Sequence, residues 1–546
     1  MKNSFLRRLA QVGVVTVLAA VSSCNLDREP IFQESANSVY TNFANYNNVL
    51  AKLYAGLATT GQKQSDDPDL KGFSDVGFTQ YMRQYWQAQE LPTDEAVIAW
   101  NDGSLPTFHL MTWDSNNEFL RMIYNRIYYQ VGICNEFIRQ TSDSKMSGNG
   151  ISTEDQKTAR QYRAEARFLR ALSYYHALDL FGNVPFVTEN DEVGAFLPKR
   201  ISRPELYNYI VSELEAISGP TGELLTKAGA ANYGRADKAS AQTLLAKMYL
   251  NAEVYTGQGI SGTNNPYTKC IENCIKVIGS GYSLTGSYTN LFRADNNTSQ
   301  EIIFPVIADG LEVRGYGNTT YLNHASIGGR RMVPANYGMN GGWAGLRTTK
   351  ALINLFPDTT QRCPDKRFQF YTWGQRLEIL GTPASNGIDN FNNGFAVTKF
   401  RNVTSTNGAP KDPSKEFSDV DFPMFRLADV YLMYAEAVER GGTGGNRATA
   451  IGYLNNLRVR AYGNTSANIT SYDLPYILAE RGRELYWEAT RRTDLVRFKK
   501  FTRDYNWPWK GNVQNGQDVA DFRNLYPIPS TELVANPNIT QNQGYN

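Results

Sequence analysis

The stretch YRAEARFLRALSYYHALDLFGNVP, residues 162–185, decides the fold that this sequence predicts. Ala164, Phe168 and Ala171 follow the spacing Ala-x3-Phe-x2-Ala, which places all three on one face of an α-helix. The two small side chains leave room for the backbone of a neighbouring helix, and the phenyl ring fills the gap between them. We therefore expect a helix here that packs closely against a second helix.

The same spacing recurs at two other places: Ala428, Leu432 and Ala435, with leucine in the middle, and more loosely Ala241, Leu245 and Met248. Tetratricopeptide repeats use this spacing on their second helix. A single match arises by chance in any helix pair, but three matches in separate helices favour a stack of helices, or solenoid. Other apolar stripes at three- and four-residue steps predict further buried helix faces.

Composition divides the chain into three parts. Residues 24–280 are mostly helical in pattern, residues 281–424 are rich in Gly, Asn and Thr, and residues 425–546 combine helices with a Pro- and Asn-rich tail. Long loops inside a compact protein are usually functional or disordered, and the Trp and Tyr residues in the middle part favour order. We expect one mainly α domain, residues 24–546: a tetratricopeptide-like helical solenoid with an irregular, loop-rich, ligand-facing region packed on it. Its C-terminal helices are predicted at Phe425–Arg440, Asn446–Ala461 and Leu474–Lys499.

The N-terminus has the pattern of an export signal. Lys2, Arg7 and Arg8 precede a short apolar run, and two serines come directly before Cys24. The apolar run is shorter than the roughly 20 residues that span a bilayer. We expect residues 1–23 to be removed and Cys24 to receive a lipid, as in bacterial lipoproteins. An ordinary secretory signal, cut nearby to leave a free thiol at Cys24, is the alternative.

Charge and cysteine content exclude several classes of function. The whole chain carries a net charge of +2, and loss of the three basic residues of the signal brings it to −1. No basic run follows, so nucleic acid is a poor partner. Cys270 and Cys274 are four residues apart on one predicted helix face, but no histidine lies close, so buried free thiols are favoured over a zinc site. We expect no metal and no cofactor.

Five blocks of sequence, taken in order, carry a family resemblance. They are residues 162–185, residues 234–250, FRLADVYLMYAEA at 425–437, the pair of segments ERGREL at 480–485 and RRTDLVRF at 491–498, and the C-terminal motifs from Pro527 to Asn542. Together they cover nearly the whole mature chain. By these blocks the sequence resembles the SusD/RagB family.

The resemblance implies a fold and a function. Members are outer-membrane lipoproteins of Bacteroidetes with a tetratricopeptide-like solenoid and an irregular region packed on it. They sit over a SusC-like TonB-dependent transporter, at the cell surface, and capture nutrients for import. The nutrient is usually a glycan, and one branch of the family handles peptides instead. Members are not enzymes, so the resemblance implies no catalytic residue.

The loop LPTDEAVIAWNDG, residues 91–103, is the best candidate for a ligand site. A sugar offers one apolar ring face and pairs of hydroxyl groups, which an aromatic plate beside planar polar groups can hold. Trp100 would stack on the sugar, and Asn101 and Asp102 would bond its hydroxyl groups. The loop is similar to the family loop that often lines the glycan site. A tryptophan packed under a turn is the alternative.

The loop-rich region supplies a second group of candidate ligand-binding residues: Tyr316, Tyr321, Asn336, Tyr337 and Trp343. Family members often place further stacking aromatic residues here. Trp343 precedes a short predicted helix, however, and pinning that helix is its alternative role. Trp113 and Trp373 are weaker candidates, and Trp507 and Trp509 would serve a surface or the transporter.

Charged residues leave two other interpretations open. Glu480, Glu484 and Glu488 are four apart on one predicted helix face, which indicates an ion-pair network between solenoid helices. A glycoside hydrolase would instead need two carboxylates at a fixed separation, and Glu95 with Asp102 or Asp94 could be drawn into such a pair. We expect Asp94 and Glu95 to brace their loop instead.

Overall fold

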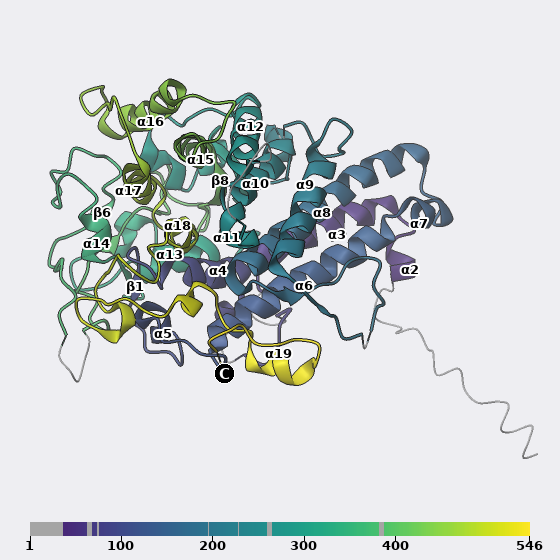
Figure 1. Cartoon of the computed structure of the whole chain (residues 1–546), viewed down its shortest axis with the longest axis horizontal. Coiled ribbons are helices and arrows are strands. Elements are labelled where there is room, and N and C mark those ends of the chain that lie inside the picture. The colour runs from purple at the N-terminus through teal and green to yellow at the C-terminus, as the bar shows by residue number, and fades with distance from the viewer. Residues whose placement is uncertain are drawn as a thin grey trace, which may run out of the picture.

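The structure, a computed structural model, describes residues 36–62, 68–73, 76–194, 196–227, 229–258, 265–381 and 387–545 (Figure 1). The predicted signal, residues 1–23, and Cys24 lie outside these residues, so lipidation stays a prediction. Among the described residues, no helix combines the length and the apolar character that crossing a bilayer requires.

Helices form most of the first half of the chain. Ser152, whose hydroxyl accepts the Asp155 N–H at 3.2 Å, caps the longest of them, and the predicted small-large-small face of that helix is buried. The helices are α2 (Ala36–Val39), α3 (Phe43–Ala58), α4 (Tyr81–Glu90), α5 (Pro106–Leu110), α6 (Glu118–Gln140), α7 (Asp143–Gly148), α8 (Thr153–Phe181), α9 (Arg203–Ser218), α10 (Lys238–Leu250), α11 (Ala252–Thr256) and α12 (Pro266–Ile278).

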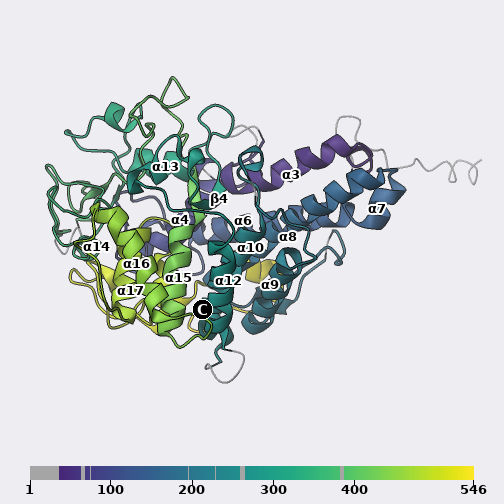
Figure 2. The same ribbon diagram turned by 90° about the horizontal axis from the view of Figure 1, so that it is seen from above.

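The long helices pack in chain order. α6 packs on α8, α8 on α9, α9 on α10 and α10 on α12, and the row continues with α15 (Leu427–Glu439) and α16 (Arg447–Tyr462). Figure 2 shows α12, α15 and α16 side by side in this row. This succession of packed helices is the predicted mainly α, tetratricopeptide-like solenoid.

The loop-rich region is an insertion into this row, because α12 and α15 pack directly on each other although residues 279–426 separate them. β4 (Ile302–Val306) and β8 (Phe422–Arg426) pair antiparallel near its two ends. The other elements of the region are short: α13 (Asn318–Ala325), α14 (Lys350–Ile353), β5 (Leu346–Arg347), β6 (Phe370–Tyr371) and β7 (Ala396–Val397). Three two-residue ladders join β1 (Val97–Ile98) to β5, β2 (Val184–Pro185) to β3 (Arg200–Ile201), and β6 to β7.

One helix predicted from the sequence is divided into two in the structure. The pattern from Leu474 to Lys499 predicts a continuous helix, but α17 (Leu474–Leu485) and α18 (Arg491–Arg497) are separated by a bend. Trp487 has φ 65° there, and its main-chain N–H donates to Glu95 Oε2 at 2.9 Å. This hydrogen bond to a distant loop replaces the one that a continuous helix would make. In the tail, α19 (Ser530–Ala535) is the last helix.

The predicted ion-pair network joins the solenoid to the loop-rich region. Glu484 is fully buried and accepts hydrogen bonds from Arg367, Arg426 and Arg460. Glu480 also pairs with Arg367, at 2.8 Å. Glu488 lies beyond the end of α17 and not on its face as predicted, yet it pairs with Arg426 at 2.6 Å. The network therefore fixes how α17 meets β8 and the loops.

Candidate ligand-binding site

An open pocket of about 500 Å³ lies where the loop at residues 91–103, here called the N-terminal loop, meets the loop-rich region. Its size is within the usual range for small-molecule sites, about 300–1,000 Å³. Five of the eight ligand-binding residues predicted from the sequence line it, together with two that were not predicted. The lining residues are Phe78, Arg83, Trp100, Asn101, Asp102, Tyr316 and Trp343. We call it the aromatic pocket.

The β1–β5 ladder positions Trp100. Val97 pairs with Arg347 and Ile98 with Leu346, and the Ala99 N–H extends the ladder by donating to Gly345 O at 2.8 Å. The indole of Trp100 then lies against Gly345, where a Cβ atom would come within 2.6 Å of Trp100 Cε2. A glycine at position 345 is thus required for this close approach.

Trp343 and Tyr316 continue the aromatic wall. The Trp343 ring stacks on His324, with centroids 4.4 Å apart and planes 8° apart. The ring centroids of Trp100 and Trp343 are 6.1 Å apart, and those of Tyr316 and Trp343 are 6.2 Å apart, with tilts of 48° and 54°. The three rings therefore form a curved wall instead of a flat stack.

Arg83 and Phe78 are the residues that the sequence did not reveal. Arg83 comes from α4, a helix whose ten residues are all buried, and its guanidinium lies 4.4 Å from the ring centroid of Tyr321 and 4.5 Å from that of Phe78. Its Nη1 donates to the main-chain carbonyl of Tyr316 at 3.2 Å. The only available signal was an arginine in a helix otherwise rich in Tyr, Trp and Gln, which also fits a buried structural residue.

Asn101 and Asp102 are exposed at the mouth of the pocket, directly after Trp100. In the described part of the chain their side chains have no hydrogen-bond partner, so both are available to a ligand. Tyr316 is 38 % exposed, and its hydroxyl donates to Glu416. That hydrogen bond to a carboxylate, together with partial burial, raises the pKa of Tyr316 to about 12.

Three predicted residues do not line the pocket. Tyr321 is fully buried beneath it, with its ring 6.0 Å from Trp100 in an edge-on arrangement, so it supports the wall and does not face a ligand. Tyr337 packs instead in a separate apolar cluster with Met339, and Arg401 lies 5.1 Å from its ring centroid. Asn336, beside Tyr337, is exposed outside the pocket. The chain turns directly after Tyr337, at Gly338, which has φ 74°.

Comparison with known proteins agrees with the solenoid and its insertion. A family model described as the SusD family matches residues 253–545. The starch-binding protein SusD of Bacteroides thetaiotaomicron is 35% identical, and the alignment covers the whole of both chains. This chain belongs to the SusD family. A further relative, the SusD-like protein P2 of Formosa agariphila, is 23% identical over 97% of this chain and 98% of its own.

Solved structures share the SusD-family fold. Surface glycan-binding protein A from Bacteroides uniformis superposes with a TM-score of 0.67 at 20% identity, covering 92% of this chain and 99% of that one. A SusD superfamily protein from Parabacteroides distasonis gives the same score at 21% identity, with the same coverage. Members of the SusD family are binding proteins, and the prediction that this chain is not an enzyme is confirmed.

Two of the three carboxylates considered for a hydrolase, Asp94 and Glu95, have structural roles in this SusD-family chain. Arg491 holds Asp94 with two bonds of 2.8 Å, and the Tyr505 hydroxyl donates to the same carboxylate at 2.7 Å. Glu95 is buried and accepts the Trp487 N–H. Both residues brace the loop that carries Trp100, as the sequence predicts.

The other tryptophans differ sharply in exposure. Trp113 is buried and donates to the Tyr545 hydroxyl at 2.8 Å, and Trp507 is also buried. Trp509 is 8% exposed, so neither Trp507 nor Trp509 offers the surface predicted for it. Trp373, in contrast, is 67% exposed.

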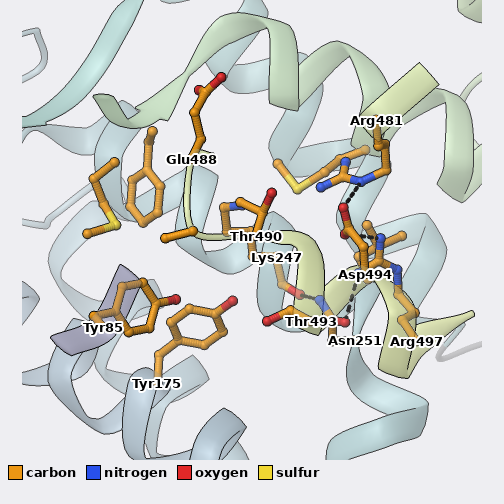
Figure 3. A pocket seen from close by; sticks show the side chains of 15 residues that line it. Tyr85, Tyr175, Lys247, Asn251, Arg481, Glu488, Thr490, Thr493, Asp494 and Arg497 are labelled. Atoms are coloured by element: carbon orange, nitrogen blue, oxygen red, sulfur yellow. Dashed lines mark hydrogen bonds and ion pairs between the residues drawn. The ribbon is translucent and has the colours of Figure 1, made fainter. Parts of the chain in front are cut away.

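A second cavity is enclosed by ion pairs and is too small for a sugar. It lies between α4, α8, α10, α17 and α18 and has a volume of about 20 Å³, which suffices for about one water molecule (Figure 3). Arg481 Nε donates to Asp494 Oδ2 at 2.7 Å on one side, and Tyr85 and Tyr175 close the other. This cavity belongs to the core of the SusD-family scaffold.

Proposed function

We propose that this protein is a cell-surface glycan-binding lipoprotein, and that the aromatic pocket holds the glycan. The observation that carries the proposal is the convergence of Trp100, Trp343 and Tyr316 with Arg83 and two free polar side chains around one open pocket. These groups come from four separate segments of the chain, so their assembly is a property of the fold and not of one loop.

The chemistry of the pocket suits a sugar chain. The apolar face of a pyranose ring stacks on an indole or phenol ring, and each such contact contributes on the order of 1 kcal/mol beyond simple burial. Three contacts would supply about 3 kcal/mol, roughly a hundredfold in affinity. Asn101 and Asp102 can bond hydroxyl groups at the mouth, where both remain solvated until the ligand arrives. The curvature of the wall favours a bent chain over a flat one.

The relative that is 35% identical is named a starch-binding protein, so α-glucans are the first ligands to test. A peptide, the alternative that the sequence left open, would be held best along an open strand edge. The aromatic pocket presents side chains instead, which supports a glycan.

Delivery to a SusC-like TonB-dependent transporter, and anchoring to the outer membrane through a lipid on Cys24, complete the proposal. Both rest on the family membership and on the N-terminal sequence pattern. Metabolic labelling with a clickable fatty acid would detect the lipid, and a Cys24→Ser variant should lose it. Cross-linking on intact cells should join the protein to a TonB-dependent barrel.

Isothermal titration of the mature chain with maltoheptaose and soluble starch tests the glycan site. The double variant Trp100→Ala/Trp343→Ala should lose measurable binding while keeping its circular dichroism spectrum. Phe196→Ala, which removes a 40% exposed aromatic ring outside the pocket, should bind like the wild type. Unchanged affinity in the double variant would contradict the proposal that the aromatic pocket binds the glycan. A folded wild type that retains peptides but no member of a glycan panel would favour the peptide alternative.

A further inference from the structure

The loop-rich region carries a second hollow, of about 250 Å³, centred on Trp373. Trp373 is the most exposed aromatic side chain in the described part of the chain. The hollow is lined by Gly328, Gly329, Arg330, Arg331, Met332, Tyr371, Trp373, Gly374, Gln375, Phe391 and Asn392. None of these residues lines the aromatic pocket.

Trp373 is presented by a tight and firmly held turn. The Gln375 N–H closes the turn on Thr372 O at 3.2 Å, and Gly374 adopts φ 78°, which a residue with a side chain rarely does. The side chain of Gln375 then ties this turn to the segment that leads into β7, accepting the Ala396 N–H at 2.7 Å and donating to Phe391 O at 3.1 Å. An exposed indole on a rigid support loses little conformational entropy when a ligand binds.

The polar groups around Trp373 suit oxygen-rich ligands. The Arg331 guanidinium lies 4.8 Å from the Trp373 ring centroid, and Arg330 and Asn392 are exposed beside it. Within the described residues, neither arginine is paired with a carboxylate, and no acidic side chain lines the hollow. The Tyr371 hydroxyl in the wall is buried and has no hydrogen-bond partner in this part of the chain. Arg331 lies over the Trp373 ring, so a sugar would stack on the part of the exposed indole that Arg331 leaves uncovered, with hydrogen-bond donors beside it.

A single backbone segment connects the hollow to the aromatic pocket. His324, on which Trp343 stacks, is followed four residues later by Gly328 at the rim of the hollow, a span of at most about 14 Å. The segment is tied to the Trp343 loop by the bonds Trp343 N–H to His324 O and Ala344 N–H to Ile327 O, both 2.8 Å. A Cβ atom at Gly328 would come within 2.6 Å of Ala344 Cα, so the two loops are in direct contact.

We infer that the hollow at Trp373 is a second carbohydrate subsite, which binds a distant sugar unit of the same glycan chain that occupies the aromatic pocket. This inference rests on the proposed function. The second contact is intramolecular once the first is made, so even a weak subsite raises the affinity for long chains while leaving short ones unaffected. The two subsites would thus select polymers over short oligosaccharides.

Chain length provides the test. Binding of maltotriose and maltoheptaose is measured by isothermal titration for the wild type, Trp373→Ala, Trp373→Phe and the control Phe196→Ala. Trp373→Ala should raise the Kd of maltoheptaose about fivefold and leave that of maltotriose unchanged. Trp373→Phe should restore part of the loss because it keeps an aromatic face. The side chain is exposed, so neither variant should unfold the protein.

The outcomes separate this inference from the proposed function. If the wild type binds both sugars and Trp373→Ala binds each as tightly as the wild type does, the proposed subsite is wrong. The proposal that the aromatic pocket binds the glycan is then unaffected. If Trp373→Ala weakens both sugars by the same factor, the effect is transmitted to the aromatic pocket, and the inference is overturned as well. If the wild type binds neither sugar, the α-glucan function fails and the subsite fails with it.

Discussion

The indole N–H of Trp100 donates a 3.0 Å hydrogen bond to the main-chain carbonyl of Trp343, across 243 residues of sequence. This bond joins the N-terminal loop to the loop-rich insertion at the point where the two form one wall. It also fixes the edge of one aromatic plate relative to the backbone of the other. The aromatic pocket is therefore a junction between two parts of the chain, and its shape depends on their docking.

Replacing each tryptophan by phenylalanine should separate this docking role from simple stacking. Trp100→Phe keeps a ring but leaves the Trp343 carbonyl without its donor, which we expect to cost about 1 kcal/mol of stability and part of the glycan affinity. Trp343→Phe is the matched control, because the indole N–H of Trp343 has no hydrogen-bond partner in the described residues. Urea unfolding of the two variants measures the difference. Equal stability would argue that the bond does not hold the loops together.

Gly345→Ala should disable the aromatic pocket without touching a ligand. The added methyl group would meet the Trp100 ring at 2.6 Å, so the indole must move away from its position in the wall. We expect glycan affinity to fall at least fivefold, the loss of about one stacking contact. Gly341→Ala, in the same loop but with no atom within 4 Å of the new Cβ, should bind normally. Titration calorimetry compares the two, and an unimpaired Gly345→Ala protein would contradict the assigned position of Trp100.

Local patterns predicted the scaffold well because its helices are amphipathic and pack on their neighbours in the chain. The small-large-small face of α8 and the glutamates of α17 behave as their spacing indicates. The bend at Trp487 was missed, because it depends on a hydrogen bond to Glu95, almost four hundred residues away. No local pattern carries that information.

The candidate site was predictable only in part for the same reason. Trp100 stood out because an aromatic residue beside Asn and Asp in a loop is typical of a sugar contact. Arg83 did not stand out, because it comes to line the pocket only when α4 packs against α13 in the folded chain (Figures 1 and 2). Tyr321 and Tyr337 were wrongly predicted to contact the ligand, because a tyrosine in a loop-rich segment packs inward as readily as outward.

Glu90 should make the protein less stable as pH rises through neutrality. Glu90 and Glu95 are both buried, and desolvation, together with their mutual repulsion, raises the pKa of Glu90 well above its usual value. Desolvation raises the pKa of Glu95 to about 7, although Arg491 opposes this. The folded state therefore binds protons more tightly than the unfolded state, so this contribution is complete below about pH 4.5 and is lost as pH rises towards 7.

Glu90→Gln tests this because the amide resembles the protonated acid and keeps the acceptor for the Thr490 N–H. The variant should gain stability at pH 8 relative to the wild type and show a smaller drop in Tm between pH 5 and pH 8. Glu312→Gln, at an exposed position, should follow the wild type. A Glu90→Gln protein with the wild-type pH profile would show that the pair does not hold a proton in this range.

Glu484→Gln should be strongly destabilising, in contrast to the loss of a surface pair. Burial alone would raise the pKa of Glu484, but Arg460, Arg426 and Arg367 outweigh it and hold that pKa far below its usual value. Removing the charge leaves three guanidinium groups short of a partner in the core, which typically costs about 3–5 kcal/mol. Glu272→Gln, which breaks an exposed pair with Lys269, should cost less than about 1 kcal/mol.

The buried glutamates Glu480 and Glu484 also decide how the stability of the protein falls at acidic pH. Arg367 and Arg483 overcome the effect of burial and lower the pKa of Glu480 to about 2, so the stability from these carboxylates is present above about pH 4.5 and is lost as pH falls towards 2. Glu484→Gln should therefore flatten the acid side of a plot of unfolding free energy against pH, as well as lower its plateau. A lower plateau with an unchanged acid slope would mean that Glu484 acts through packing alone, because a lost titration must change the slope.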